Sequence, residues 1–332
     1  MSVGSGIGGQ CGLAKETTYG TYAAPTAFVP ASKAAFQLVK NTVQASYVGA
    51  GRLMDLGSGR RVTTTAGKGT LDLDIYNTGF GLLLRALMGN SASTSEGGSP
   101  VAYLQTHTLG DTFGQSLTAQ VGIPDTSGAV HPYTFLGAKV TDATFTLESD
   151  KESTAEFNFD ARQVVETQTL AAASYTTAMR PYVGTDMAVL VGATYGAEAS
   201  VNGVRKVVLK VDRKLAIDRF YAGGAGLHDE PIISDFADLS GTITADNVDK
   251  TVFADRFASD AGFSLRVDLT GLVISGSNNF RFSLILPQCF LDGDTPVLDG
   301  PGIVSGDFAY TAKFDGTNLP RIEYMTTDAT IG

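Results

Sequence analysis

Apolar and polar residues alternate with period two in several stretches of the chain. These stretches are residues 70–75, 143–148, 155–160, 265–269, 281–286 and 307–314. This alternation predicts strands that have one buried and one solvated face. Antiparallel sheets commonly keep one face wet, so the pattern predicts a mainly antiparallel β protein.

Two short segments have the spacing of amphipathic helices instead. Asn77 or Thr78 can cap a helix that ends at Gly89, and Asp249 can cap one that ends near Ala258. The polar segment 90–100 between the first helix and the next strand predicts a flexible insertion. Many strands beside few helices favour a β-sandwich or partial barrel with one flanking helix.

These patterns occur twice in the same order. The motif GTLDLD begins at Gly69 and the motif GTITAD begins at Gly241, 172 residues later, and each precedes a helical pattern. The other matching pairs are 36–39 with 207–210, 49–51 with 224–226, 116–121 with 264–269 and 157–159 with 308–310. An internal repeat of this kind predicts a fused dimer of one domain and an assembly with pseudo-symmetry.

The repeat divides the chain into two tandem β-sandwich domains. We predict a first domain at 1–166 with an N-terminal arm, and a second at 167–332 with a linker and a C-terminal arm. Each domain is expected to carry one flanking helix and one long loop between strands. A length of 332 residues is sufficient for two separate cores.

Charge and cysteine content exclude several classes of protein. The net charge of −10 disfavours DNA binding through neutralised phosphates. No apolar run is long enough to span a bilayer, so no membrane partner is expected. Cys11 and Cys289 lack metal-ligand spacing and are expected to be reduced thiols of a protein made in a cytosol.

Motifs that would indicate catalysis are weak. The segment 4–9 matches G-x-G-x-x-G but follows no strand and opens no helix, so we interpret it as a flexible arm. His107, His131 and His228 are scattered without the pattern of a metal site. No nucleophile motif accompanies them. We therefore predict no enzymatic activity, no cofactor and no bound metal.

Two long loops, one in each half, differ in charge. Residues 48–68 carry a net charge of +3, and residues 222–240 carry −4. Loops of this length usually have a function, so we interpret them as docking arms for neighbouring subunits. The alternative is a pair of solvated loops that diverged independently. The predicted docking residues are Arg52, Arg60, Arg61, Asp229, Glu230, Asp235 and Asp238.

A family resemblance is carried by short motifs that keep their order over most of the chain. They are residues 12–21 (GLAKETTYGT), 77–84 (NTGFGLLL), 108–111 (TLGD), 116–118 (SLT), 122–128 (GIPDTSG), 292–296 (DGDTP) and 315–318 (DGTN). In these motifs the chain resembles the major tail tube proteins of long, non-contractile, siphovirus-type bacteriophage tails.

The resemblance implies a structural virion protein that polymerises as stacked rings into a conduit for DNA ejection. Family members with one domain form six-membered rings, so three two-domain chains are expected per ring, with pseudo-sixfold symmetry. The resemblance also implies partners: other copies of the chain, a tape-measure protein, a tail terminator and a tail tip. DNA would pass without specific binding, and the tail would assemble in the host bacterial cytoplasm.

A lumen for DNA should be acidic or neutral, because a basic wall would hold the phosphates. The alternating strands offer Asp72, Asp74, Glu156 and Asp160 as lumen candidates. A soluble carbohydrate-binding β-sandwich is the alternative function. Such a protein usually exposes aromatic residues on one face, and the absence of Trp counts against it. A hydrolase is less favoured still, since no motif supplies a nucleophile.

Overall fold

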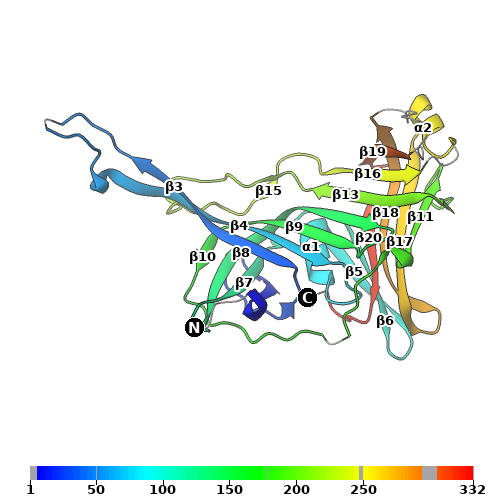
Figure 1. Ribbon diagram of the computed structural model, residues 1–332, viewed down its shortest axis with the longest axis horizontal. Coiled ribbons are helices and arrows are strands. Elements are labelled where there is room, and N and C mark those ends of the chain that lie inside the picture. Colours follow the sequence, from blue (N-terminus) through cyan, green and yellow to red (C-terminus); the bar gives the residue numbers. More distant parts are fainter. Residues whose placement is uncertain (1–5, 50, 177, 247–249, 294–304, 332) are drawn as a thin grey trace.

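The computed structural model describes residues 6–331, apart from residues 50, 177, 247–249 and 294–304. The predicted fold class is confirmed: the chain is mainly β, with large antiparallel sheets and two short helices among the described residues (Figure 1). Three 3-10 turns, Gly6–Gly8, Gly57–Gly59 and Gly184–Asp186, complete the described elements.

The elements of the first half span residues 10–165. They are β1 (Gln10–Lys15), β2 (Ala27–Phe28), β3 (Lys33–Gln44), β4 (Arg60–Asp74), α1 (Gly81–Met88), β5 (Gly89–Gly97), β6 (Ala102–Leu109), β7 (Leu117–Pro124), β8 (Val130–Glu148), β9 (Thr154–Ala161) and β10 (Gln163–Val165). The predicted boundary at residue 166 falls just after β10, and the division into two domains stays a prediction.

The second half begins inside residues 165–203, which were predicted to be the linker between the halves, because β11 and β12 lie within this segment. Its elements are β11 (Met187–Gly192), β12 (Ala199–Ser200), β13 (Val204–Asp212), β14 (Leu215–Ala216), β15 (Ile232–Ile233), β16 (Asp238–Asp246), α2 (Ala254–Ser259), β17 (Phe263–Ser275), β18 (Asn278–Asp292), β19 (Ser305–Lys313) and β20 (Arg321–Thr326).

Both halves have the same strand order. In the first half, neighbouring strands of the sheet follow the order β3–β4–β9–β8. In the second half, they follow the order β13–β16–β19–β18. Gly69 lies opposite Phe159 in the first half, and Gly241 lies opposite Tyr310 in the second. The repeated glycine therefore has an equivalent position in both sheets.

A direct strand pairing joins the halves into one sheet. The end of β8 pairs with β13 from Asp142 opposite Asp212 to Glu148 opposite Lys206. The resulting sheet runs β3–β4–β9–β8–β13–β16–β19–β18 across the molecule (Figure 1). One hydrophobic core crosses this junction, since Phe80 from the first half packs on Phe282 and Tyr324 from the second.

The segment 90–100 differs from the prediction of a flexible insertion. Residues 89–97 form β5, which pairs with β6, and β6 in turn pairs with β20 at the end of the second half. Small Ser and Thr side chains fit the solvated face of such an added strand. The C-terminal tail also returns to the first half, where the Asp328 carboxylate accepts a hydrogen bond of 2.7 Å from the Gly79 backbone N–H.

The first predicted helix is confirmed as α1, which ends where Gly89 adopts a φ of 90° that favours glycine. Neither Asn77 nor Thr78 caps it, because Phe80 occupies the N-cap position. The second helix is confirmed as α2, and its predicted cap Asp249 lies outside the described residues. In the part of the chain that the structure describes, no helix has the length and apolar character needed to cross a bilayer.

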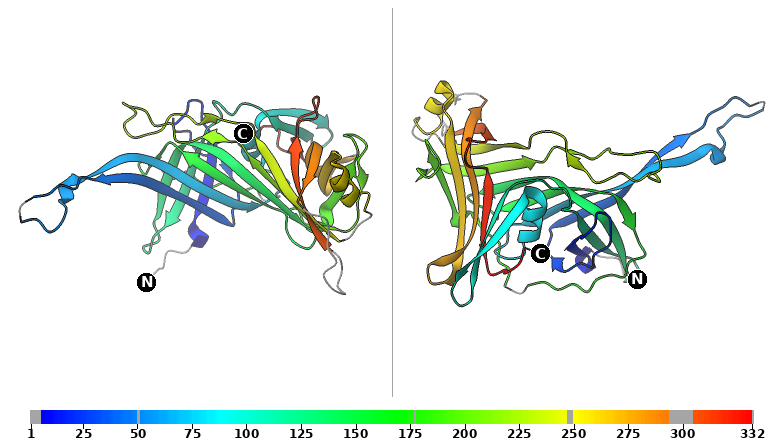
Figure 2. Two further views of the ribbon diagram at one scale, coloured as in Figure 1. Left: turned by 90° about the horizontal axis from the view of Figure 1, so that it is seen from above. Right: turned by 180° about the vertical axis from the view of Figure 1, so that it is seen from behind.

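A hairpin arm extends from each half of the sheet. The first arm, residues 41–65, comprises the outer parts of β3 and β4 and projects far from the body (Figure 2). The second arm, residues 213–237, includes the short β14–β15 ladder and runs in the same direction, over the first half (Figure 1).

Candidate functional site

The long sheet has one apolar face and one polar face. On β4 and β9, Leu71, Leu73 and Phe157 point into the core, and the residues between them point outward. Acidic residues outnumber basic ones on the outward face. The acidic ones are Asp72, Asp74, Asp142, Glu148, Glu156, Asp160, Asp212, Asp238, Asp246, Asp292 and Asp307; the basic ones are Lys33, Lys68, Lys139, Arg205, Lys206, Lys210 and Lys313.

A charge pair crosses the junction on this polar face. The Lys206 ammonium lies 2.7 Å from the Glu148 carboxylate of the neighbouring strand. Hydrogen bonds from Lys151 and Lys206 lower the pKa of Glu148. The carboxylate therefore stays ionised, and the junction is held by both backbone pairing and side-chain charge.

Three of the four predicted lumen candidates lie on the accessible part of the polar face. Asp72 lies opposite Glu156 in the strand register and forms an ion pair with Lys33. Asp74 is two residues further along β4 and is partly exposed.

Asp160 has a different environment from the other three. The second arm covers it, and only 3% of the residue is exposed. Asp160 lies on the outward side of its strand, as the alternation predicted. The second arm covers this position, however, so it offers no free surface to a lumen.

The first arm exposes both apolar and basic residues. Leu53 is 99% exposed and Met54 is 85% exposed at the tip. The Arg52 guanidinium lies over the Tyr47 ring at 5.1 Å. Arg60 and Arg61 are exposed residues of β4, so this part of the predicted loop is a strand.

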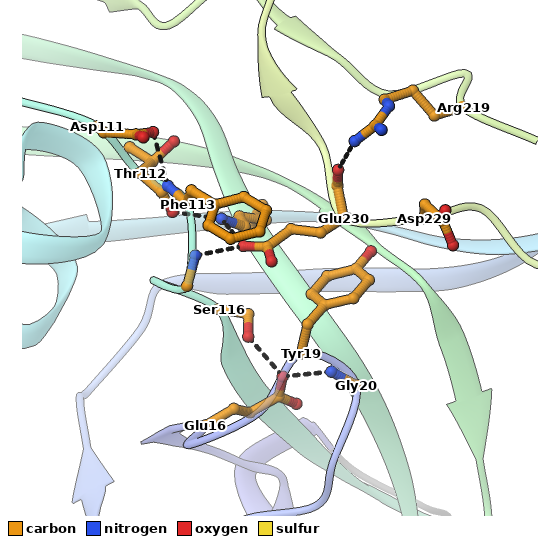
Figure 3. Close-up of polar contacts among 12 residues, drawn as sticks. Glu16, Tyr19, Gly20, Asp111, Thr112, Phe113, Ser116, Arg219, Asp229 and Glu230 are labelled. Atoms are coloured by element: carbon orange, nitrogen blue, oxygen red, sulfur yellow. Dashed lines mark hydrogen bonds and ion pairs between the residues drawn. The ribbon is translucent and has the colours of Figure 1, made fainter.

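The second arm is fastened to the first half by a buried ion pair. The Glu230 carboxylate binds the Lys139 ammonium and accepts a hydrogen bond of 2.6 Å from the Gly114 backbone N–H (Figure 3). Lys139 also donates to the Thr112 carbonyl. Burial lowers the pKa of Lys139, and the Glu230 carboxylate opposes that shift. A charged group buried this fully needs such a partner.

A histidine anchors the same arm deeper in the first half. His228 is fully buried; its ring lies 3.2 Å from the Asp160 carboxylate and 3.3 Å from the Tyr19 hydroxyl. Burial raises the pKa of Asp160 to about 6, against the attraction of His228. Beside the arm strand, the Thr65 backbone N–H donates to the Gly226 carbonyl. The second arm thus covers a strand edge that β9 leaves free.

The remaining predicted docking residues have varied surroundings. Asp229 and Asp235 are exposed on the second arm, and Asp238 is partly exposed where the arm joins β16. Glu230 already has a partner within its own chain. The predicted contacts of these seven residues with other subunits stay predictions.

The described residues contain no group of three or more His, Cys, Asp and Glu residues that could hold a metal ion. Burial raises the pKa of Cys11 to about 12 and also raises that of Cys289, so neither thiol is ionised near neutral pH. His107 is buried against the Ser91 hydroxyl, and burial lowers its pKa to about 3. Cys11, Cys289 and His107 therefore serve as packed, uncharged side chains of the interior.

The comparison with known families gives a match over most of the chain. The model of the phage tail tube protein family matches residues 6–312. The chain belongs to the phage tail tube protein family. No curated protein matches the chain. Membership of this structural family supports the predicted virion role and does not favour the carbohydrate-binding alternative.

Sequence reasoning about this tail tube chain missed the residues that hold the second arm. Lys139 and Tyr19 were not singled out, and His228 was interpreted as an isolated histidine. One signal was present: Thr-Tyr-Gly occurs at 18–20 and again at 194–196. The first of these motifs supplies Tyr19, so the repeat marks a structurally equivalent turn in each half.

Proposed function

We propose that three chains of this tail tube protein close into a ring with pseudo-sixfold symmetry, and that rings stack into the tail tube. The junction between β8 and β13 supports this proposal, because it joins two equivalent halves into one sheet. A junction of the same kind between chains would repeat the rotation from one half to the next. A heterologous contact that repeats one rotation closes into a ring.

The free edge of β3 is suited to the contact between chains. Within the described ranges, β3 pairs with β4 alone, whereas its counterpart β13 has a partner on both sides. An unpaired edge of twelve residues is a template for another strand. Closing the ring would cover this edge in every chain.

The polar face of the sheet is suited to the wall of a DNA conduit. Its acidic residues, Asp72 and Glu156 among them, would repel phosphates, and DNA would slide without specific binding. The Lys and Thr residues between them keep the surface wet. We place Asp72, Asp74 and Glu156 at the lumen and leave Asp160 out, because it is buried.

The two arms would give each ring face an alternating charge pattern. The first arm carries exposed Arg52, Arg60 and Arg61, and the second carries exposed Asp229 and Asp235. Three basic and three acidic arms per ring would favour one stacking rotation, since a wrong rotation places like charges together. Each exposed pair contributes only about 0–1 kcal/mol, so the effect depends on repetition along the polymer.

The assembled protein would act in the virion tail of a siphovirus-type phage, after assembly in the host cytoplasm. Its partners would be neighbouring rings, a tape-measure protein, a tail terminator and a tail tip. The purified chain should form rings or tubes in which rotational averaging of electron micrographs gives threefold symmetry. Native mass spectrometry should give a ring mass of three chains. A ring of six whole chains would contradict the proposal.

A further inference from the structure

The second arm is joined at two places to one short loop of the first half. This loop, residues 110–114, follows β6 and precedes β7. At the start of the arm, the Arg213 guanidinium donates a hydrogen bond to the Gly110 carbonyl. Further along the arm, the Glu230 carboxylate accepts one from the Gly114 backbone N–H (Figure 3). The same loop therefore receives one charged side chain from each end of the arm.

The two places differ in how the buried charge is balanced. Lys139 is 1% exposed, and the Glu230 carboxylate is its direct partner. Arg213 is 2% exposed, yet it forms no ion pair with any residue that the structure describes. Burying a charge is costly unless an opposite charge and hydrogen bonds compensate for it. Arg213 is therefore a buried cation without a direct counter-ion in this part of the chain.

Asp111 is the carboxylate of the loop that could have supplied this counter-ion. It is exposed, and its side chain instead accepts a hydrogen bond of 2.9 Å from the Phe113 backbone N–H. Burial lowers the pKa of Arg213, and the charge of Asp111 opposes that shift. A guanidinium stays protonated in proteins, so the positive charge of Arg213 remains to be balanced.

Several buried donors at this place lack an acceptor. The Nε and Nη1 atoms of Arg213 are buried and have no hydrogen-bond partner among the described residues. The Thr112 hydroxyl, on the same loop, is also buried without a described partner, and Thr112 is 1% exposed. The Thr112 carbonyl is already bound by Lys139. What these donors require is an acceptor, and the guanidinium also requires a negative charge.

We propose that a small monovalent anion of the halide class binds between Arg213 and the Thr112 hydroxyl. A water molecule would accept hydrogen bonds but leave the charge of the guanidinium unbalanced, whereas a halide supplies both the acceptor and the charge. The guanidinium is more weakly hydrated than an ammonium group, which suits a weakly hydrated anion such as chloride or bromide. The anion would connect the start of the second arm to loop 110–114.

The internal repeat shows that the fold itself does not require this buried charge. Extending the match of residues 36–39 with 207–210 makes Thr42 the counterpart of Arg213. Thr42 is exposed in the first arm, which does not pack on its own chain. The buried arginine thus belongs to the packed arm, and the proposed anion site belongs to that packing.

The site predicts that chloride stabilises the chain specifically. Urea unfolding of the full chain should be compared in chloride and in gluconate at equal ionic strength. The unfolding equilibrium constant should be about tenfold lower in about 0.1 M chloride, which corresponds to a dissociation constant of about 10 mM. Bromide should act as chloride does, and acetate should act as gluconate does. Equal unfolding curves in chloride and gluconate would overturn the proposal.

Variants show whether the chloride effect comes from this site. Arg213→Gln should abolish the difference between chloride and gluconate, and Thr112→Val, which keeps the shape of the side chain, should reduce it by roughly half or more. Arg205→Gln is the matched control, because Arg205 is exposed on the same strand and pairs with Asp246 at 2.9 Å. It should keep the full difference. A chloride effect of unchanged size in Thr112→Val and in Arg213→Gln would mean that the anion binds elsewhere.

Diffraction from crystals of the full chain grown with bromide supplies a second readout, which remains decisive if Arg213→Gln does not fold. An anomalous peak should lie within hydrogen-bond distance of Arg213 and Thr112. An ordered water molecule there, or the Asp111 carboxylate turned onto Arg213, would overturn the proposal. So would a bromide peak without any chloride effect in solution, since it would show binding at crystal concentration only. None of these outcomes depends on the proposed ring.

Discussion

The two arms begin from equivalent strands, yet their surroundings are opposite. The second arm lies on the first half with His228 and Glu230 buried, whereas the first arm leaves Leu53 and Met54 in solvent. Equivalent starting strands therefore do not give the two arms the same packing. Within the described residues, the second arm lies on the first half of its own chain, whereas Leu53 and Met54 of the first arm have no such cover.

The largest effect should come from breaking the ion pair of the second arm. Lys139→Met leaves the Glu230 carboxylate largely buried without its cation, which typically costs about 3–5 kcal/mol. The free energy of unfolding of the unassembled chain, measured in urea, should fall by about this amount.

Lys33→Met is the matched control, because it breaks an exposed pair with Asp72 and should cost under about 1 kcal/mol. Adding Glu230→Gln to Lys139→Met should recover part of the loss. Equal losses in the two single variants would mean that the buried pair does not hold the arm.

Substitutions at a packed residue of the second arm and at an exposed residue of the first arm should show the asymmetry between the arms directly. His228→Met leaves Asp160 without its neighbour and should destabilise the unassembled chain by about 1–3 kcal/mol. Met54→His changes an exposed side chain and should stay within about 0.5 kcal/mol. Thermal denaturation of both variants at one pH measures the difference; similar shifts would contradict the contrast between a packed and a free tip.

The covering of Asp160 predicts a pH dependence with a definite sign. Burial raises its pKa from 3.8 to about 6, so the folded state holds this proton more tightly than the unfolded state. The stability that this group contributes is present below pH 3.8 and is lost as the pH rises through 6.

The Asp160→Asn variant lacks the ionisable carboxyl group, so it does not lose that stability as the pH rises. Its free energy of unfolding, relative to the unmodified chain, should rise by about 1–2 kcal/mol between pH 4.5 and pH 7.5. Asp72→Asn, on the same face but uncovered, serves as the control. A relative stability of Asp160→Asn that falls with rising pH would contradict the assignment.

The smallest effect on folding should come from the exposed shaft of the first arm. Arg60→Glu with Arg61→Glu should leave the free energy of unfolding within about 0.5 kcal/mol, since both residues are exposed. The same variant should weaken tubes or change their twist and salt resistance. Arg180→Glu with Lys250→Glu changes the net charge equally at exposed sites outside the arms. Unchanged tubes would mean that the arms act only as spacers.

Local pattern predicted most of the elements. Alternation around Leu71 and Phe157 predicted strands, and Gly89 marked the end of the first helix. The β5 segment was missed because Ser and Thr side chains give no hydrophobic period, and its strand depends on pairing with β6. Arg60 and Arg61 were predicted to lie in a loop for a similar reason, because their strand depends on pairing with β3.

The packing of the second arm was beyond sequence reasoning. Lys139 and Glu230 are separated by most of a domain in sequence, and neither occurs in a motif that indicates pairing. The burial of Asp160 follows from that packing. The alternation along its strand predicted a solvated position, because it carries no information about the arm that covers this position. The duplicated Thr-Tyr-Gly turn was the one readable signal, and it marks a surface without showing what covers it.

The strand junction between β8 and β13 has a consequence for the fidelity of assembly. A separate single domain could close by mistake into a circle of five or seven units, because small changes in the contact angle select the number. A chain whose two units are joined through a common sheet and core adds units only in pairs, so odd-membered circles cannot form. The nearest errors are then four or eight units, each requiring a much larger change of angle at every contact. Joining two units in one chain would thereby exclude rings with an odd number of units and so limit errors in the diameter of the tail tube.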